Sequence, residues 1–522
     1  MRYAKGASLA LLLLFLLFTL VRCYRSPFSA SDLETVPDSV EYAVSAQRFA
    51  LWGRYEIKIN DQAFPPRYAP WFPILLLSPI YTLFPKEIGN GIIAILLCAV
   101  FCVLVAFGIG HRAGGNWGGF FSACAVVLSP IFVTWSRQIM SDIPTLLFVL
   151  LAGWQFVQLC QKPSTKGYVL AGLYCGIAYA FRSLSIALLL PYLYLLFKNR
   201  KQALPALSLF VLPSLIVYVA TGIYNLKTFG AWGRNGYHYW CAVPYDYSTL
   251  VFSLRYVGAN LSLFGNWMGY VPLLLGGVGL LLLYRTKCVV AQPLMLFLLF
   301  AVVPMTCVHL LYFVPDLRFF LSLLIWSSIL GGAGIGSLLQ SRLSQGKWAN
   351  VEWVLVGVSF VTVFMAGIYR PDEQPGRRVV TEVMNDALPS NGILVTALDP
   401  VYLEPMLVRG EKRRIIPLSR SVEYASKVIM PQRVPTLEPP PKSPIDHRCL
   451  ALLHSGAQEA VKETAEEGFE TIENLIRAGR EVYLDGSPTT RGDSAFNSME
   501  AHFRIEPTKT QFLFRLALKP TN

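Results

Sequence analysis

The sequence predicts a polytopic α-helical membrane protein with about 11 transmembrane helices, followed by a C-terminal soluble α/β domain. Of the 522 residues, 54% are apolar or aromatic and 15% are charged, whereas a soluble domain typically carries about 25% charged residues. Long apolar runs continue to Met365 and thin out after Arg370. We therefore expect a transmembrane domain over residues 1–369 and an α/β domain over 370–522.

The transmembrane domain is predicted from apolar runs, because a helix that crosses the ~30 Å hydrocarbon core needs about 20 mostly apolar residues. The first run follows Arg2 and Lys5 as in a signal peptide, but no small-residue cleavage site follows it, so we expect a retained span. Prolines interrupt Ala69 to Pro85, which favours an interfacial or re-entrant piece. The candidate spans are 7–23, 88–109, 117–134, 143–160, 167–181, 183–197, 203–224, 271–284, 289–310, 319–339 and 349–369.

The distribution of charge between these spans predicts the orientation. The loops on the side of the N-terminus hold twelve Lys and Arg residues and no acidic residue, which the positive-inside rule assigns to the cytoplasm. We expect a multi-pass protein of the cell membrane with a cytoplasmic N-terminus, large outside loops at 24–87 and 225–270, and the C-terminal domain outside. The twelve are Arg2, Lys5, Arg112, Lys162, Lys166, Lys198, Arg200, Lys201, Arg285, Lys287, Arg342 and Lys347.

The net charge of +13 follows from this orientation. When these twelve residues are left out, the rest of the chain has 33 basic and 32 acidic residues. The excess of positive charge therefore gives no support to nucleic-acid binding. Ten cysteines occur without a CxxC pair, and most lie in apolar runs. We therefore expect neither a zinc site nor a disulfide framework, and the sequence offers no convincing cluster of metal ligands.

The C-terminal region has the pattern of an α/β domain. We expect a helix at 378–387 and a strand at 393–397, then a proline-rich linker near 435–444. A strand at 449–453, a helix at 457–478 and a strand at 481–484 would form a βαβ unit. Asp399 and His454 follow strand-like segments, and we interpret both as loop residues without a catalytic role.

Carboxylates in the outside loops are candidates for acid–base chemistry. Asp38 and Glu41 are three residues apart and would share one face of a helix. A carboxylate just above a membrane helix suits a general base that deprotonates a hydroxyl or an amine. Alternatively, Asp38 caps the helix and Glu41 completes a capping box. Asp142 lies in a second, short outside loop, and ionisable residues at the membrane surface are candidate functional positions.

Four arginines lie at or near the outer ends of predicted spans. Guanidinium groups suit bidentate phosphate binding, so together they could bind an anionic lipid head group. The alternative for each is snorkelling, or pairing with Asp142 or Asp316. His309 could join them or could be a packed polar residue. The arginines are Arg67, Arg137, Arg182 and Arg318.

The order of these motifs resembles the GT-C superfamily of membrane glycosyltransferases, in the branch that contains protein O-mannosyltransferases and the lipid A aminoarabinose transferase. The resemblance covers roughly residues 1–340. It rests on Pro37-Asp38-Ser39-Val40-Glu41-Tyr42, Pro65-Pro66-Arg67-Tyr68, Ser136-Arg137 with Ser141-Asp142-Ile143-Pro144, Gly172 to Arg182, Tyr224-Asn225, Phe229-Gly230, Gly236-Tyr237 and Arg318-Phe319-Phe320.

The resemblance implies a GT-C-like fold and an inverting glycosyltransferase of hexosyl or pentosyl type. Such an enzyme would move a sugar from a polyprenyl-phosphate donor to a glycan, lipid or protein acceptor on the outer face, with no cofactor or metal required. Asp38 would be the catalytic base, Glu41 would help to position the acceptor, and Asp142 would lie near the acceptor and the sugar. The donor phosphate would be held by Arg67, with Arg137, Arg182 and Arg318 as further candidates.

Two other classes of function remain open from the sequence. A transporter or flippase of lipid-linked saccharides would also be a polytopic membrane protein, although the internal repeats that are frequent in transporters are not found here. A non-catalytic assembly protein could use the outside α/β domain as a binding module.

Overall fold

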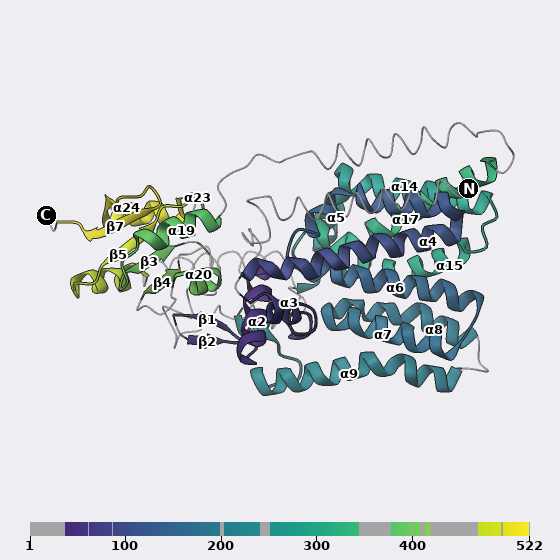
Figure 1. The fold of residues 1–522 in the computed structure, drawn as a ribbon, viewed down its shortest axis with the longest axis horizontal. Coiled ribbons are helices and arrows are strands. Elements are labelled where there is room, and N and C mark those ends of the chain that lie inside the picture. Colours follow the sequence, from purple (N-terminus) through teal and green to yellow (C-terminus); the bar gives the residue numbers. More distant parts are fainter. Residues whose placement is uncertain are drawn as a thin grey trace. The chain divides into compact units, whose positions relative to one another are not determined.

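The computed structural model describes residues 37–60, 62–85, 87–198, 203–240, 251–343, 377–396, 398, 400–407, 413–417, 468–491 and 494–520. The described residues form two compact units (Figure 1). The first contains residues 90–224 and those from 252 to 343, and the second contains 37–89, 225–240 and those from 377 onward. The predicted spans 7–23 and 349–369, the linker 435–444, the strand 449–453, Asp399 and His454 lie outside the described residues.

The first unit is helical. All nine spans predicted between residues 88 and 339 fall on helical structure. Six helical segments in the described part of the chain are long and apolar enough to cross a membrane. The helices are α4 (Ile92–Val127), α5 (Pro130–Trp135), α6 (Asp142–Gln161), α7 (Thr165–Phe181), α8 (Leu189–Lys198), α9 (Ala203–Phe229), α13 (Val257–Ser262), α14 (Trp267–Arg285), α15 (Ala291–Phe297), α16 (Val303–Leu310) and α17 (Leu321–Leu343).

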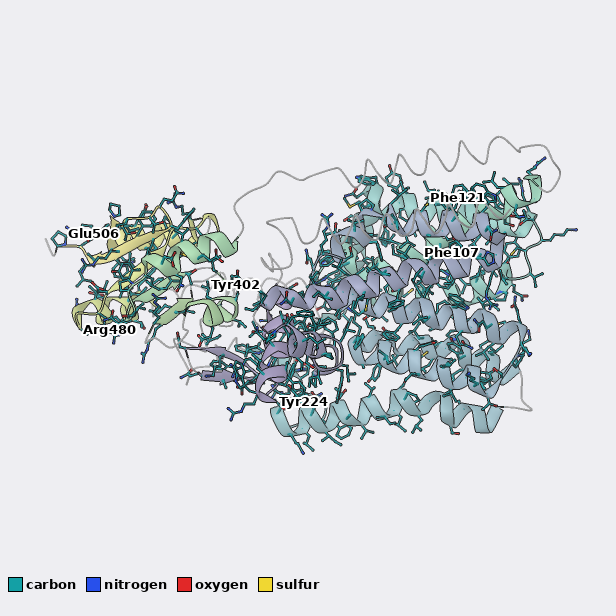
Figure 2. The ribbon with its side chains drawn as sticks, viewed as in Figure 1. Phe107, Phe121, Tyr224, Tyr402, Arg480 and Glu506 are labelled. Carbon is teal, nitrogen blue, oxygen red and sulfur yellow. The ribbon has the colours of Figure 1, made fainter. Side chains whose placement is uncertain are left out.

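Helix α4 reverses its direction at Gly114–Gly115. Gly115 has a φ of 61° and a ψ of −153°, a conformation that glycine adopts readily. A straight helix would separate Phe107 from Gly119 by about 18 Å, yet a Cβ on Gly119 would lie 2.9 Å from the Phe107 side chain. Phe107 and Phe121 accordingly lie on neighbouring arms (Figure 2). The reversal separates the predicted spans 88–109 and 117–134.

Small residues set the close packing of α17 against α4 and α14. A Cβ on Gly336 of α17 would lie 2.1 Å from the backbone nitrogen of Gly118 in α4. A Cβ on Gly279 of α14 would lie 2.1 Å from the carbonyl oxygen of Leu330. Membrane helices are held largely by van der Waals packing, and small residues allow their backbones to approach.

Elsewhere on α14, large apolar side chains are exposed. Leu274, Val278 and Leu281 are 64%, 51% and 55% exposed. A contiguous apolar surface of this kind is unfavourable in water but suits contact with lipid. The two sides of α14 therefore differ: one packs against α17, and the other exposes the apolar side chains expected of a helix in contact with lipid.

The second unit begins with α2 (Pro37–Trp52) and a hairpin of β1 (Ile57–Ile59) and β2 (Gln62–Phe64). A short helix follows, with π geometry over Pro73–Leu77 and α geometry in α3 (Ser78–Leu83), and it packs on α2. At 1.5 Å per residue it is about 16 Å long, too short to cross a bilayer. This agrees with the interfacial or re-entrant segment predicted at 69–85.

The same unit contains a five-stranded sheet of order β4-β3-β5-β7-β6. Strands β4, β3 and β5 are parallel, whereas β7 is antiparallel to both β5 and β6. The core packs around the central strands, which are buried along their whole length as expected for parallel strands. The strands are β3 (Ile393–Thr396), β4 (Arg414–Pro417), β5 (Val482–Asp485), β6 (Phe503–Pro507) and β7 (Leu513–Leu518).

These elements confirm the predicted α/β region. The expected strands 393–397 and 481–484 correspond to β3 and β5, and the helix 378–387 corresponds to α19 (Arg377–Ala387). The predicted helix 457–478 is helical over its described part, from 468 to 477. The second unit also contains the α-helices α10 (Gly236–Trp240), α20 (Pro400–Leu407), α23 (Pro488–Arg491) and α24 (Ser494–His502).

Candidate functional site

Asp38 lies in the first turn of α2, one turn before Glu41. The helix already includes Pro37, so Asp38 is a helical residue and does not precede the helix as a cap would. Glu41 is fully buried, and its carboxylate binds Arg67. Asp38 and Glu41 therefore do not form a capping box at the start of α2, and their carboxylates have different surroundings.

Glu41 and Arg67 form a buried two-point contact. The Arg67 Nε donates to Glu41 Oε1 at 3.0 Å, and the Arg67 backbone nitrogen donates to Glu41 Oε2 at 3.0 Å. The side chains are 0% and 11% exposed for Glu41 and Arg67. Burial of charges is costly unless they are paired and hydrogen-bonded, so this geometry fixes both the backbone and the side chain of Arg67.

Helix α10 holds the segment before Arg67 from the other side. The Trp240 Nε1 donates to the Pro65 carbonyl oxygen at 2.9 Å. A Cβ on Gly236 would lie 2.3 Å from the Arg67 Cα and 2.4 Å from the Pro66 carbonyl oxygen. Only glycine allows this approach. The outside loops predicted at 24–87 and 225–270 thus meet at the segment that carries Arg67.

Tyr68 lies beside these charges. Its ring centroid is 4.3 Å from that of Tyr42 and 5.5 Å from that of Tyr237. Burial raises the pKa of the Tyr68 phenol well above its usual range, and the charge of Asp38 raises it further. The phenol therefore stays protonated at neutral pH, next to the charge of Asp38.

A second cluster lies in the first unit, where α6 begins and α7 ends. The Arg182 Nη2 lies 2.9 Å from Asp142 Oδ1, and the Asp142 side chain is 1% exposed. The Arg182 Nε also donates to the Ser141 Oγ at 3.4 Å. Asp142 is the first residue of α6, where the helix dipole favours a negative charge.

Three side chains of this cluster, Arg182, Arg318 and His309, pack against the ring of Phe319. The Arg318 and Arg182 guanidinium carbons lie 4.9 Å and 5.6 Å from its centroid, within the range of cation–π attraction. His309 stacks on the same ring at 5.2 Å, with 13° between the planes. Arg318 also pairs with Asp316, with 3.2 Å between Nε and Oδ2.

The predicted site residues therefore fall into two groups. Asp38, Glu41 and Arg67 belong to the second unit. The first unit brings together Arg182 with Asp142 and Arg318 with Asp316, as the pairing alternative expected, and it joins the two arginines through Phe319. Among the described residues, Arg137 is not part of this cluster of contacts and lies between α5 and α6.

The sequence analysis assigned no role to three residues that lie beside the arginines. Tyr68, Gly236 and Phe319 all belong to the motifs that carry the resemblance, but no local pattern indicates what they contact. Within the described ranges, no three His, Cys, Asp or Glu side chains gather closely enough to hold a metal ion.

Comparison with known proteins supports the resemblance. A family model described as dolichyl-phosphate-mannose-protein mannosyltransferase matches residues 68–224. A search of curated proteins gave no significant match.

Solved structures match nearly the whole chain. ArnT from Cupriavidus metallidurans bound to undecaprenyl phosphate has a TM-score of 0.59 at 13% identity and covers 97% of both chains. Its apo state has a TM-score of 0.58 at 13% identity, with the same coverage. The oligosaccharyltransferase AglB from Archaeoglobus fulgidus, in complex with an inhibitory peptide and a dolichol-phosphate, has a TM-score of 0.54 at 10% identity and covers 98% of this chain and 74% of that chain.

These matches confirm the predicted fold class. The chain has the fold of ArnT and AglB, with a C-terminal α/β region. Its apolar helices agree with a multi-pass membrane protein.

Proposed function

We propose that the protein is an inverting glycosyltransferase of the cell membrane. It moves a sugar from a polyprenyl-phosphate-linked donor to an acceptor on the outer face. The fold supports this proposal, because two proteins that share it are described in complex with undecaprenyl phosphate and with a dolichol-phosphate. The family match over residues 68–224 supports the same class of enzyme.

The observation that carries the mechanism is the contrast between Asp38 and Glu41. Glu41 is buried and engaged by Arg67, whereas Asp38 is partly exposed one turn earlier on α2. Asp38 is therefore the carboxylate that we assign as general base. We assign to Glu41 the role of holding Arg67. This replaces the role that the resemblance implies, in which Glu41 helps to position the acceptor.

The reaction needs one proton transfer and one displacement. The acceptor hydroxyl or amine attacks the anomeric carbon of the donor sugar while Asp38 takes its proton. The bond between that carbon and the phosphate oxygen breaks, and the polyprenyl phosphate leaves with the electron pair. Attack opposite the leaving group inverts the anomeric centre. Fixed cations stabilise the negative charge that develops on the phosphate. We propose Arg67 as one candidate, and Arg182 with Arg318 as a separate candidate in the first unit.

The test is direct transfer by the purified protein. The protein is incubated with polyprenyl-phosphate-linked hexoses and pentoses and with glycan, lipid and peptide acceptors, and mass spectrometry detects the addition of one sugar. Asp38→Asn should reduce transfer about 10²- to 10⁴-fold, the usual contribution of a general base, with an unchanged melting temperature. Glu56→Gln is the matched control, because Glu56 lies in the same loop and pairs with Arg48.

Two outcomes would overturn the proposal. Normal transfer by Asp38→Asn would remove Asp38 as the base. If reconstituted protein moves labelled lipid-linked saccharide across a bilayer and forms no glycosidic bond, the protein is a flippase.

A further inference from the structure

Asn60 joins the first outside loop to the C-terminal α/β domain. It lies at the turn between β1 and β2, with a φ of 52°. Its Nδ2 donates to the Ile415 carbonyl oxygen at 2.8 Å, and its Oδ1 accepts from the Ile415 backbone nitrogen at 2.7 Å. The Asn60 backbone nitrogen donates to Glu404 Oε2 at 2.8 Å. Both partners belong to the same compact unit as Asn60.

The Asn60 amide takes the place of a neighbouring strand. Ile415 lies in β4, the strand at one edge of the five-stranded sheet. An edge strand has backbone donors and acceptors that no further strand satisfies. The carboxamide of asparagine offers one acceptor and two donors in one plane, so it can bond both backbone groups of Ile415. The side chain thus extends the hydrogen-bonding of the sheet by one residue.

None of these contacts is needed to form the hairpin itself. Strands β1 and β2 pair with each other through their own backbones, with Ile59 opposite Gln62. The three hydrogen bonds of Asn60 instead fix the tip of the hairpin to β4 and α20. Glu404 is only 9% exposed, so its contact with the Asn60 nitrogen is largely shielded from water.

The hairpin leads directly to Arg67. Strand β2 ends at Phe64, whose ring centroid is 5.6 Å from that of Trp240. Trp240 holds the Pro65 carbonyl oxygen, and two residues later the Arg67 nitrogen donates to Glu41. Between the tip of the hairpin and Arg67 there are only six residues. A displacement of the hairpin tip would therefore shift β2 and, with it, the Arg67 guanidinium.

We propose that the C-terminal α/β domain positions Arg67 by holding the hairpin tip through Asn60. Asn60 is a positioning residue: it acts on Arg67 and does not contact substrate. The consequence for catalysis rests on the proposed function, whereas the anchoring of the hairpin does not.

The anchoring is tested by hydrogen exchange on the full-length protein. Asn60→Gly keeps a residue that accepts the positive φ and removes the side-chain bonds to Ile415. Asn60→Asp keeps the acceptor but loses the Nδ2 donor and adds a charge near Glu404. We expect amide exchange in the peptide that covers 62–68 to increase at least tenfold in both variants. The control, Gln62→Ala, alters an exposed side chain of the same hairpin and should leave exchange unchanged. Exchange that stays at the wild-type rate in Asn60→Gly would overturn the proposal.

The positioning role is tested by a double-mutant cycle on sugar transfer. We expect Asn60→Gly to lower kcat about tenfold or more, because displacing a group of an active site, here the Arg67 guanidinium, by about 1 Å has an effect of this size. On an Arg67→Ala background the same change should have no further effect, because the group that it misplaces is gone. Equal effects on both backgrounds, or no effect on transfer, would overturn positioning through Arg67. If the wild-type protein transfers no sugar, the proposed function fails while the exchange result still decides the anchoring.

Discussion

Both oxygens of the Glu41 carboxylate accept hydrogen bonds from Arg67, one from the side chain and one from the backbone. The two residues are 26 positions apart, on a helix and on a loop. A single carboxylate therefore fixes the position of the chain at Arg67 and the direction of its guanidinium.

Removing the charge of Glu41 should destabilise the protein. Glu41→Gln leaves the Arg67 guanidinium buried beside a neutral group, and breaking a buried pair in this way typically costs about 3–5 kcal/mol. We expect a clear fall in melting temperature. Glu473→Gln is the control, because Glu473 pairs with Arg477 on the surface and such pairs contribute about 0.3–0.5 kcal/mol.

The double variant Glu41→Gln with Arg67→Met separates stability from catalysis. It removes both charges, so the melting temperature should recover in part. Transfer should stay low, because the proposed phosphate ligand is absent. Full recovery of transfer would show that Arg67 has no role in the reaction.

The glycine at 236 should be required for the geometry at Arg67. The added methyl group of Gly236→Ala would overlap the Arg67 backbone and push the segment away from α10. A displacement of about 1 Å can reduce turnover about 10²-fold, so we expect a large loss of transfer. Gly233→Ala serves as the matched variant, because a Cβ there has no atom of the described structure within 4 Å. Equal activity of the two variants would contradict the assignment.

The ring of Phe319 should matter for binding of the lipid phosphate. Phe319→Leu removes the surface on which Arg182 and Arg318 rest, and each contact of this kind contributes about 0.5–2 kcal/mol. We expect the purified variant to bind undecaprenyl phosphate roughly 3- to 30-fold more weakly, as measured by native mass spectrometry. Phe264→Leu, which alters a ring packed on Phe320, should bind the lipid as the wild type does.

Helix packing in the first unit gives a stability test within one helix. Gly279→Ala would bring a methyl group against the backbone of α17, and overpacking typically costs about 1–3 kcal/mol. Gly277→Ala, two residues away, meets no atom of the described structure within 4 Å. We expect a lower melting temperature for the first variant alone, measured in detergent and in nanodiscs. A similar loss in both variants would argue against the packing account.

The orientation predicted from charge can be measured by cysteine labelling. In a cysteine-free background, Gln62→Cys should react with an impermeant maleimide in sealed right-side-out vesicles. Lys166→Cys should react only after the vesicles are opened. Both positions are exposed side chains. The reverse pattern would place the first loop and its carboxylates in the cytoplasm.

The helical elements were predictable because each depends on local sequence. Apolar runs of sufficient length predict spans, and the nine that the structure describes are helical. The strands β3 and β5 were predictable for the same reason, as short apolar runs between turn residues. The hairpin of β6 and β7 was not predicted, although Phe503 and Ile505 alternate with Arg504 and Glu506 in the pattern of a half-buried strand.

The contacts of the site were much less predictable than its residues. Asp38, Glu41 and Arg67 were chosen from residue type and place, but nothing in their spacing shows that Glu41 is the partner of Arg67. That pairing depends on how the hairpin returns the chain to α2. The roles of Gly236 and Asn60 likewise depend on partners far away in the sequence, which no local pattern reports.

The reversal at Gly114–Gly115 also bears on how the protein is made. The two arms of α4 touch close to the turn, so only a short connection joins them. We therefore expect the two arms to insert into the bilayer as one helical hairpin. An epitope tag placed at this turn should separate the arms and lower the amount of inserted protein.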